Sequence, residues 1–320
     1  MKNVLVTGVN GFVGSHLVDE LLTKDFNIHG TFFGAAAGAI NKLNISLHEL
    51  NICSKADVMR VVKQASPDYV YHLAAHSSAR TSWLSPDLTW VTNTCGCLYL
   101  LEAVRNFVPD ARVLLVGSSQ QYGATALNIG STNENVPQIP DNIYAISKVA
   151  QESLGKVYAK DKNIHTVMTR SFNHAGPRQS EEFVVAHFAK QIAMIERGKK
   201  EPVLSVGNLD ARRDITDVRD VVRAYTLLLE TGVRGDVYNV GSGCVYSMRE
   251  ILEKLLALSD AKIKIAYDIE RMRQGDMPLL LCNNSKLIKA TGWTPSFSIE
   301  QTLYDTLKYW RNKVEETGYE

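Results

Sequence analysis

The sequence predicts an α/β fold: a doubly wound parallel sheet followed by a smaller α/β domain. Short β-branched apolar segments alternate with longer segments of helical apolar spacing, and this alternation stops after Arg170. Helices that connect consecutive parallel strands cover both faces of a sheet, because such crossovers are right-handed. We therefore expect a Rossmann-like domain over residues 1–172 and a second domain over 173–320, between which segments of the chain could be exchanged.

Six strands and four helices are expected in the first domain. The strands are predicted at residues 3–7, 28–33, 47–52, 69–73, 112–116 and 165–170, and the helices at 12–24, 55–64, 87–107 and 143–160. A Gly/Pro segment at 173–182 opens the second domain. Helices are predicted there near 183–197 and at 299–313, where apolar residues recur at helical spacing.

Composition excludes several classes of protein. With 35 Lys and Arg against 34 Asp and Glu, the net charge of +1 provides no field for nucleic acid or a membrane surface. No apolar stretch approaches the roughly 20 residues of a membrane helix, and the apolar run at 4–6 is too short for a signal peptide. The five cysteines, odd in number and without a CxxC pair, indicate reduced thiols and no metal site. We expect a cytoplasmic protein without a nucleic-acid or membrane partner.

A glycine-rich turn follows the first predicted strand. Three glycines form GxxGxxG within TGVNGFVG, immediately before the first helix. Such a turn lets backbone N–H groups at a helix N-terminus approach a pyrophosphate, which the helix dipole also favours. The pattern predicts that a nicotinamide dinucleotide is bound by Gly8, Asn10, Gly11, Phe12, Val13 and Gly14. A close-packed turn without a ligand is the alternative.

The sequence leaves the choice between NADH and NADPH open, with a slight preference for NADPH. NAD binders usually carry an acid at the end of the second strand and NADP binders an arginine nearby, whereas Phe32 and Phe33 stand at that position here. Lys42 could supply a cation from the following loop. Asn51, at the end of the third predicted strand, either bonds the adenine amino group or ends the strand in a turn.

Three residues form the predicted catalytic group. Tyr144 and Lys148 are spaced i, i+4, on one face of a helix, and Ser118 lies at a strand end, where open α/β sheets carry their chemistry. The charge of Lys148 is expected to lower the pKa of Tyr144 from about 10, so that the phenol can give a proton to the alkoxide formed by hydride transfer. Ser118 would hydrogen-bond the substrate oxygen, and Lys148 would also hold the nicotinamide ribose. An exposed tyrosine beside a solvated lysine is the alternative.

The ordered motifs TGVNGFVG, HLAAHSS, NTCGCLYLLEA, GSSQQYG, YAISK and RSFNHAGPRQ resemble those of the extended short-chain dehydrogenase/reductases along nearly the whole chain. Within that superfamily, FNHAGPRQSEEFV, VGNLDARRDITDVRD, NVGSG and RQGDMPLLLCNNSKL are most similar to the GDP-mannose 4,6-dehydratases and GDP-6-deoxy-D-mannose reductases. The resemblance implies an NAD(P)-dependent enzyme, a GDP-sugar substrate, and a homodimer formed through the helices at 87–107 and 143–160.

The resemblance also assigns roles to further residues. Those expected at the substrate are Ser78, Ser119, Gln120, Asn173 (at the sugar diphosphate), Phe183, Val184 and His187 (at the guanine), Arg213 and Arg273 (at the phosphates), and Asp276 (at the ribose). Further cofactor contacts are expected from Ile52, Leu73, Ala74, Ala75, Asn93, Phe172 and His174. A guanidinium suits a diphosphate because it binds two oxygens at once. The alternative for Arg213 is an ion pair with Asp214 or Asp217.

One residue separates the two activities of this group. A 4,6-dehydratase must remove the proton at C5, which the family assigns to a glutamate at the position of Gln120, three residues before Gly123. A neutral amide cannot accept a proton, so the sequence favours reduction of the C4 ketone of a GDP-4-keto-6-deoxy sugar, giving GDP-D-rhamnose or a close relative. A 4-keto heptose fits the same residues. The alternatives are a dehydratase with altered acid/base groups and a nucleotide-sensing protein without catalysis, against which the intact catalytic group speaks.

Overall fold

The computed structural model has a seven-stranded parallel sheet at its centre. The structure describes residues 1–34, 45–123, 125, 130–268 and 279–316. The strand order is β10-β6-β5-β4-β1-β2-β3, and every neighbouring pair is parallel, which confirms the predicted fold class. The strands are β1 (Lys2–Thr7), β2 (Phe26–Phe32), β3 (Ser46–Glu49), β4 (Tyr69–His72), β5 (Arg112–Ser118), β6 (His165–Ser171) and β10 (Val237–Val240).

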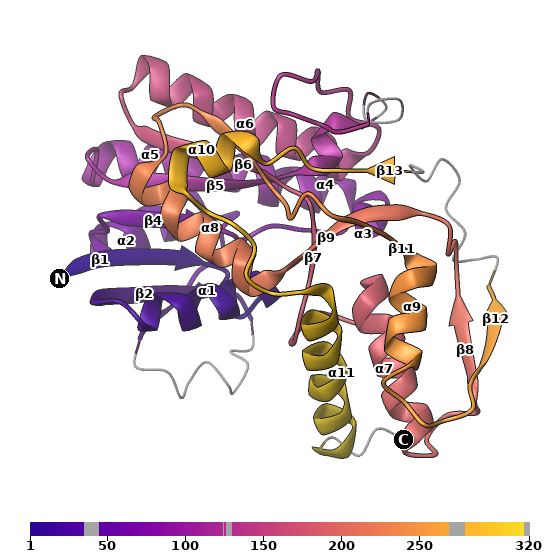
Figure 1. Ribbon diagram of the computed structural model, residues 1–320. Helices are drawn as coiled ribbons and strands as arrows, with labels where there is room; N and C mark the ends of the chain where they lie inside the picture. Colours follow the sequence, from indigo (N-terminus) through magenta and orange to yellow (C-terminus); the bar gives the residue numbers. More distant parts are fainter. Residues whose placement is uncertain (35–44, 124, 126–129, 269–278, 317–320) are drawn as a thin grey trace.

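Two helical layers cover this sheet (Figure 1). One face carries α1 (Phe12–Leu22), α8 (Val218–Thr231) and α10 (Ser285–Thr291), and the other carries α2 (Lys55–Ala65), α5 (Gly96–Phe107) and α6 (Ile143–Asp161). Val4 and Val6 point into the first core and Leu5 into the second, as the alternation of side chains along a strand requires. Strands buried on both faces explain the continuous apolar runs in the sequence.

The carboxyl ends of β1, β4 and β5 meet at one edge of the sheet. The register pairs Thr7 with His72 across β1 and β4, and Ser118 with Ser171 across β5 and β6. The glycine turn, the loop after β4 and Ser118 therefore leave the sheet on the same side. Open α/β sheets bind ligands at this edge.

Residues beyond 172 contribute to both domains. β10 lies beside β6, and α8 packs against α1, so the chain returns to the main sheet. The remaining part, at the centre and right of Figure 1, contains a small sheet of β7 (Asn173–Ala175), β9 (Arg212–Asp217), β11 (Val245–Ser247) and β13 (Leu279–Leu280), and the pair β8 (Val203–Val206) and β12 (Lys264–Tyr267). Its core is shared by α7 (Val184–Glu196), α9 (Met248–Leu256) and α11 (Ile299–Glu316).

The structure corrects two predicted elements. The helix expected at 87–107 is divided into α4 (Pro86–Trp90), a π-helical turn (Val91–Cys95) and α5, and α3 (Ala79–Leu84) precedes it. The wide turn carries Asn93, whose side chain exchanges hydrogen bonds with the main chain of His76. The strand expected at 47–52 ends at Glu49, because Asn51 is in a turn where its Oδ1 accepts a hydrogen bond from the Cys53 N–H.

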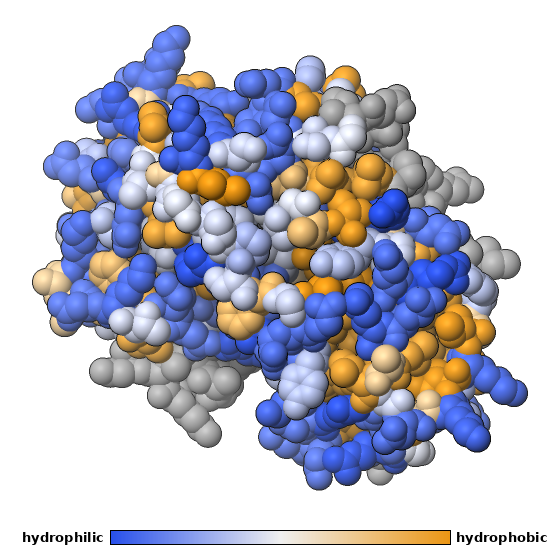
Figure 2. Space-filling view, in the orientation of Figure 1, coloured by the Kyte–Doolittle hydropathy of each residue, from blue (hydrophilic) through white to orange (hydrophobic). Residues whose placement is uncertain are grey.

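Hydrophilic residues cover most of the face seen in Figure 2, and apolar residues gather on its right side, over the second domain and above it. Trp83 and Leu84 of α3 and Leu88 of α4 are also strongly exposed. None of the helices in the described ranges is long and apolar enough to cross a membrane.

Candidate active site

The glycine turn between β1 and α1 is closely packed and leaves no room for side chains at Gly8 and Gly14. Gly8 has a φ of +77°, and a Cβ there would lie 3.2 Å from the Ala74 backbone. A Cβ on Gly14 would lie 2.1 Å from the Gly8 carbonyl oxygen. Gly11 is the N-cap of α1 and offers no side-chain hydrogen bond to the helix start. The first N–H groups of α1 therefore depend on water or an anion, which fits the diphosphate of a dinucleotide.

Hydrogen bonds hold the loop after β4 beside this turn. Thr7 Oγ1 accepts hydrogen bonds from the N–H groups of Leu73 (3.1 Å) and Ala74 (3.0 Å). Its own proton is directed to His72 Nδ1 at 3.0 Å. Burial, assisted by the charge of Lys148, lowers the pKa of His72 to about 3, so the ring is neutral and serves as an acceptor. Leu73, Ala74 and the following Ala75 are thereby held close to Gly8.

A cavity of about 190 Å³ lies where β2 and β3 end, and it is lined by Phe33, Glu49, Asn51, Asp57 and Arg60. Arg60 Nη2 donates to the Glu49 carbonyl oxygen (3.2 Å) and to Asp57 Oδ1 (3.4 Å). Rossmann-like domains bind the adenosine ribose near the end of the second strand. The sequence did not predict that Arg60 lines this cavity, because Arg60 is on α2, far along the chain from β2.

Asn93 is an internal support and not a surface contact. The residue is 0% exposed, and its Oδ1 accepts a hydrogen bond from the His76 N–H at 2.8 Å. Its Nδ2 donates to the His76 carbonyl oxygen (3.1 Å) and to Ser147 Oγ (2.9 Å). The Asn93 side chain therefore ties the loop after β4 to α6, and its expected cofactor contact stays a prediction.

Ser118, at the end of β5, interacts with Tyr144, in the first turn of α6, closely enough to lower the pKa of the phenol. The side-chain oxygen of Asn142 accepts a hydrogen bond from the Ala145 N–H at 2.9 Å, which fixes the first turn of α6 and with it Tyr144. Burial raises the pKa of Tyr144 above its ordinary value, and the interaction with Ser118 only partly opposes this. Tyr144 is therefore a neutral phenol, a proton donor, at neutral pH.

Lys148 follows Tyr144 by four residues, but its ammonium group is directed to β5. Nζ donates to the Val116 carbonyl oxygen (2.8 Å) and to Gln151 Oε1 (3.0 Å). Burial lowers the pKa of Lys148 to about 8. The structure thus corrects the expected electrostatics, since the pKa of Tyr144 is raised and not lowered. Gln151, three residues after Lys148 on the same helix, is a support that the i, i+3 spacing could have revealed.

Gln120 adjoins this group. Its N–H donates to Ser118 Oγ at 3.2 Å, and its side-chain oxygen accepts a hydrogen bond from Asn142 Nδ2 at 3.3 Å. Gln120 is partly exposed, whereas Ser119 is buried. The side chain next to Ser118 and Tyr144 is therefore an amide with both hydrogen-bonding and solvent contact.

The residues expected at the guanine share the first turn of α7. Phe183 is its N-cap and Val184 its first residue, and both are more than a third exposed. The N–H of His187 donates to the Phe183 carbonyl oxygen at 2.8 Å. Ser78 lies elsewhere, at the start of α3, where its hydroxyl accepts a hydrogen bond from the Thr81 N–H.

Asn173 and Arg213 are on neighbouring strands, β7 and β9. The carboxylate of Asp214 accepts hydrogen bonds from the N–H groups of residues 242 and 243, and that of Asp217 pairs with Arg219 at 2.7 Å. Both carboxylates considered as partners of Arg213 are thus held by other groups. Arg273, Asp276 and Lys42 lie outside the described residues.

His174 and Phe172 differ in their access to the glycine turn. The ring of His174 stacks on Phe12 with centroids 5.9 Å apart, and its Nδ1 donates to the Phe172 carbonyl oxygen at 2.9 Å. Phe172 is buried in an apolar cluster with Tyr122 and Cys282. The expected cofactor contact of Phe172 stays a prediction, and His174 lies against the helix that follows the turn. Ile52 is also buried, beneath Asn51.

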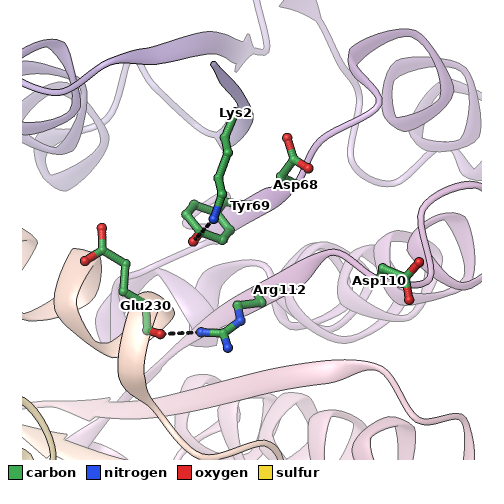
Figure 3. A pocket seen from close by; sticks show the side chains of 6 residues that line it. All are labelled: Lys2, Asp68, Tyr69, Asp110, Arg112 and Glu230. Atoms are coloured by element: carbon green, nitrogen blue, oxygen red, sulfur yellow. Dashed lines mark hydrogen bonds between the residues drawn. The ribbon is translucent and has the colours of Figure 1, made fainter.

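A second hollow, of about 390 Å³, lies at the opposite edge of the sheet (Figure 3) and is lined by Lys2, Asp68, Tyr69, Asp110, Arg112 and Glu230. Arg112 donates to the carbonyl oxygens of Leu229 and Glu230, and Lys2 to the Tyr69 hydroxyl. These contacts tie the start of β5 to the end of α8, and the start of β1 to that of β4. They have a structural role, far from the strand ends that carry the catalytic group. Nowhere in the described ranges do three His, Cys, Asp or Glu side chains gather as a metal site.

Comparisons with known proteins cover nearly the whole chain. The family model for GDP-mannose 4,6 dehydratase matches residues 5–306. The GDP-6-deoxy-D-mannose reductase of Pseudomonas aeruginosa is 33% identical over 315 residues, which cover 98% of this chain and 99% of that protein. A GDP-mannose 4,6-dehydratase of Vibrio cholerae is 26% identical, over 94% of this chain and 91% of that protein.

Solved structures agree with these matches. RMD from Pseudomonas aeruginosa, complexed with NADPH, superposes with a TM-score of 0.87 at 31% identity, over 98% of this chain and 100% of that one. A UDP-glucose 4-epimerase of Thermotoga maritima, with UDP-glucose, gives a TM-score of 0.89 at 27% identity, over 98% and 99%. The resemblance inferred from the motifs is confirmed. The chain belongs to the GDP-mannose 4,6-dehydratase family, within the extended short-chain dehydrogenase/reductases.

Proposed function

We propose that this protein is an NAD(P)H-dependent reductase of the C4 ketone of a GDP-4-keto-6-deoxy sugar, such as GDP-4-keto-6-deoxy-D-mannose. The observation that carries the proposal is the amide side chain of Gln120, which lies beside Ser118 and Asn142, next to Tyr144. The Pseudomonas aeruginosa relative named as a reductase supports it. The Vibrio cholerae relative named as a dehydratase defines the alternative.

The side chains of this site supply hydrogen bonds and a proton. When bound, NAD(P)H supplies the hydride that reduces the ketone carbon. Ser118 donates a hydrogen bond to the substrate oxygen, and Tyr144 gives that oxygen its phenolic proton as negative charge develops there. Burial keeps this proton on Tyr144 at neutral pH. Lys148, with a pKa of about 8, is charged at pH 7 and holds the cofactor ribose.

Gln120 separates this reaction from dehydration. A 4,6-dehydratase needs a base that accepts the C5 proton, and a neutral amide is not basic enough at any pH at which the protein is folded. The Gln120 side chain can orient a sugar hydroxyl by hydrogen bonding. It therefore suits a one-step reduction that needs no second acid/base group.

We further propose that the glycine turn holds the cofactor diphosphate and that the cavity beside Arg60 receives the adenosine end. Exposed apolar side chains on α4 and α6, among them Leu88, Trp90 and Ile146, support association of two copies through these helices. The five unpaired cysteines support a reducing, cytoplasmic location.

Isotope transfer tests the proposed reaction. The protein is incubated with GDP-4-keto-6-deoxy-mannose and NADPH or NADH that carries deuterium on both faces of nicotinamide C4. A reductase places one deuterium at C4 of the sugar, which mass spectrometry and NMR detect. Formation of the 4-keto sugar from GDP-mannose, with no deuterium taken from the cofactor, would instead identify a dehydratase.

A further inference from the structure

We propose that Gln121 is a positioning residue, which holds Ser118 in place by linking its main-chain N–H to a buried ion pair between Glu152 and Arg170. The inference rests on the proposed role of Ser118 in the reduction. Gln121 follows the residue that distinguishes reductase from dehydratase and has no part in the proton transfer itself.

Both ends of the Gln121 amide are bound inside the protein. Oε1 accepts a hydrogen bond from the Ser118 N–H at 2.8 Å, and Nε2 donates to Glu152 Oε2 at 2.8 Å. The side chain is 0% exposed, so water does not compete for these contacts. Ser118 and Gln121 also cap the 3₁₀ turn Ser119–Tyr122 reciprocally. The turn therefore fixes both the main chain and the hydroxyl of Ser118.

The ion pair between Glu152 and Arg170 fixes the carboxylate to which Gln121 is hydrogen-bonded. Arg170 Nε and Nη2 bind the two oxygens of Glu152 at 2.9 and 2.8 Å, and both side chains are almost fully buried. Lys156 and Gln138 donate to the same carboxylate at 2.6 and 3.0 Å. Although burial acts in the opposite direction, Arg170 and Lys156 lower the pKa of Glu152. The amide N–H of Gln121 thus faces a permanent negative charge, which makes a stronger hydrogen bond than a neutral acceptor.

The strand register brings the ion pair and the catalytic serine together. β5 and β6 pair Gly117 with Arg170, and Ser118 with the next residue of β6. A Cβ on Gly117 would lie 2.4 Å from Gln121 Oε1 and 2.2 Å from the Thr169 carbonyl oxygen, so glycine is required beneath the amide. Displacing a catalytic group by about 1 Å can cost about 100-fold in rate. Loss of the amide is therefore expected to act on kcat through Ser118.

Steady-state kinetics of two matched variants test the link. Gln121→Leu removes both hydrogen bonds at similar size, and Gln138→Leu removes one from the same carboxylate oxygen without touching Ser118. We expect kcat to fall about 10- to 100-fold in Gln121→Leu, with the KM for cofactor changed less than about twofold. Gln138→Leu should stay within about twofold of wild type. In a Ser118→Ala background, Gln121→Leu should cost less than about twofold more; an equal loss in both backgrounds would overturn the proposal.

Hydrogen–deuterium exchange separates this inference from the proposed function. The peptide that contains Ser118 should exchange faster in Gln121→Leu than in wild type or Gln138→Leu, whatever reaction the protein catalyses. Unchanged exchange would overturn the link to Gln121. Full activity of Ser118→Ala, with exchange altered as expected, would instead overturn the catalytic role of Ser118.

A conservative variant keeps the test decisive if Gln121→Leu does not fold. The carboxyl group of Gln121→Glu, while protonated, can accept from Ser118 and donate to Glu152 as the amide does. Its ionisation would place two carboxylates together, which is strongly unfavourable. The kcat of Gln121→Glu should therefore fall with rising pH through an ionisation that wild type lacks. A pH profile identical to that of wild type would contradict the proposed contact.

Discussion

The charge of Lys148 costs folding free energy, and this cost depends on pH in a way that can be measured. The side chain is buried, which lowers its pKa from 10.5 to about 8. Between these two values the unfolded chain binds more protons at this site than the folded chain. The destabilisation is therefore complete below pH 8 and disappears as the pH rises through 10.5.

The two pKa values give the magnitude. At about 1.4 kcal/mol for each pKa unit, the charged side chain costs about 3 kcal/mol at pH 7. At pH 9.5 the folded form has lost the proton, and about 1 kcal/mol of this cost remains. Lys148→Met removes the charge at every pH. The free energy of unfolding of wild type should therefore rise by about 2 kcal/mol relative to that of Lys148→Met between pH 7 and pH 9.5.

Urea unfolding at the two pH values, followed by circular dichroism, measures this difference. The hydrogen bonds that Lys148 makes to Val116 and Gln151 are lost equally at both pH values and cancel in the comparison. The control is Lys160→Met, at an exposed position near the end of the same helix. It should change the free energy of unfolding equally at the two pH values. A gap between wild type and Lys148→Met that changes by less than about 0.5 kcal/mol would refute the reasoning that burial of the charge sets its energy.

Three further outcomes are expected. Tyr144→Phe should lower kcat by at least about 100-fold in the reductase assay, since general acids contribute about 10²- to 10⁴-fold, with little change in thermal midpoint; unaltered turnover would remove Tyr144 as proton donor. Arg60→Ala should raise the KM for NADPH about tenfold more than that for NADH, because only carboxylates would remain charged in its cavity; equal changes would place the extra phosphate elsewhere. Gly14→Ala should weaken cofactor binding by about 10- to 100-fold in calorimetric titration, because the new Cβ would lie 2.1 Å from the Gly8 oxygen. Gly130→Ala, whose Cβ meets nothing within 4 Å, should bind normally, and equal loss in both would argue against the tight turn.

The main sheet and the glycine turn were predictable because their signals are local. Buried strands such as β1 are apolar on both faces, and the GxxGxxG spacing directly follows one of them. The place of β10 in this sheet was not predictable, because nothing in its four residues indicates which sheet they join. The π-helical turn at Asn93 also depends on a partner, His76, in a separate loop.

The site residues also differ in whether their signal is local or depends on a partner far along the chain. The i, i+4 spacing of Tyr144 and Lys148 predicted one helix face, but the direction of the ammonium depends on Val116 of β5, which no spacing reveals. The pattern S-x-x-Q at Ser118 and Gln121 is a capping-box signal and could have been recognised in the sequence. The hydrogen bond from Gln121 to Glu152 could not have been recognised, because Glu152 lies on α6, far along the chain.

The most direct test of the central claim is the absorbance of reduced nicotinamide while the purified protein meets freshly prepared GDP-4-keto-6-deoxy-mannose, with NADPH and NADH in separate cuvettes. We predict that one equivalent of cofactor is oxidised for each GDP-6-deoxyhexose formed, and that the rate of this oxidation falls at least about 100-fold in Tyr144→Phe. Conversion of GDP-mannose to the 4-keto sugar, with no net oxidation of cofactor, would contradict the account and show that Gln120 does not exclude dehydration.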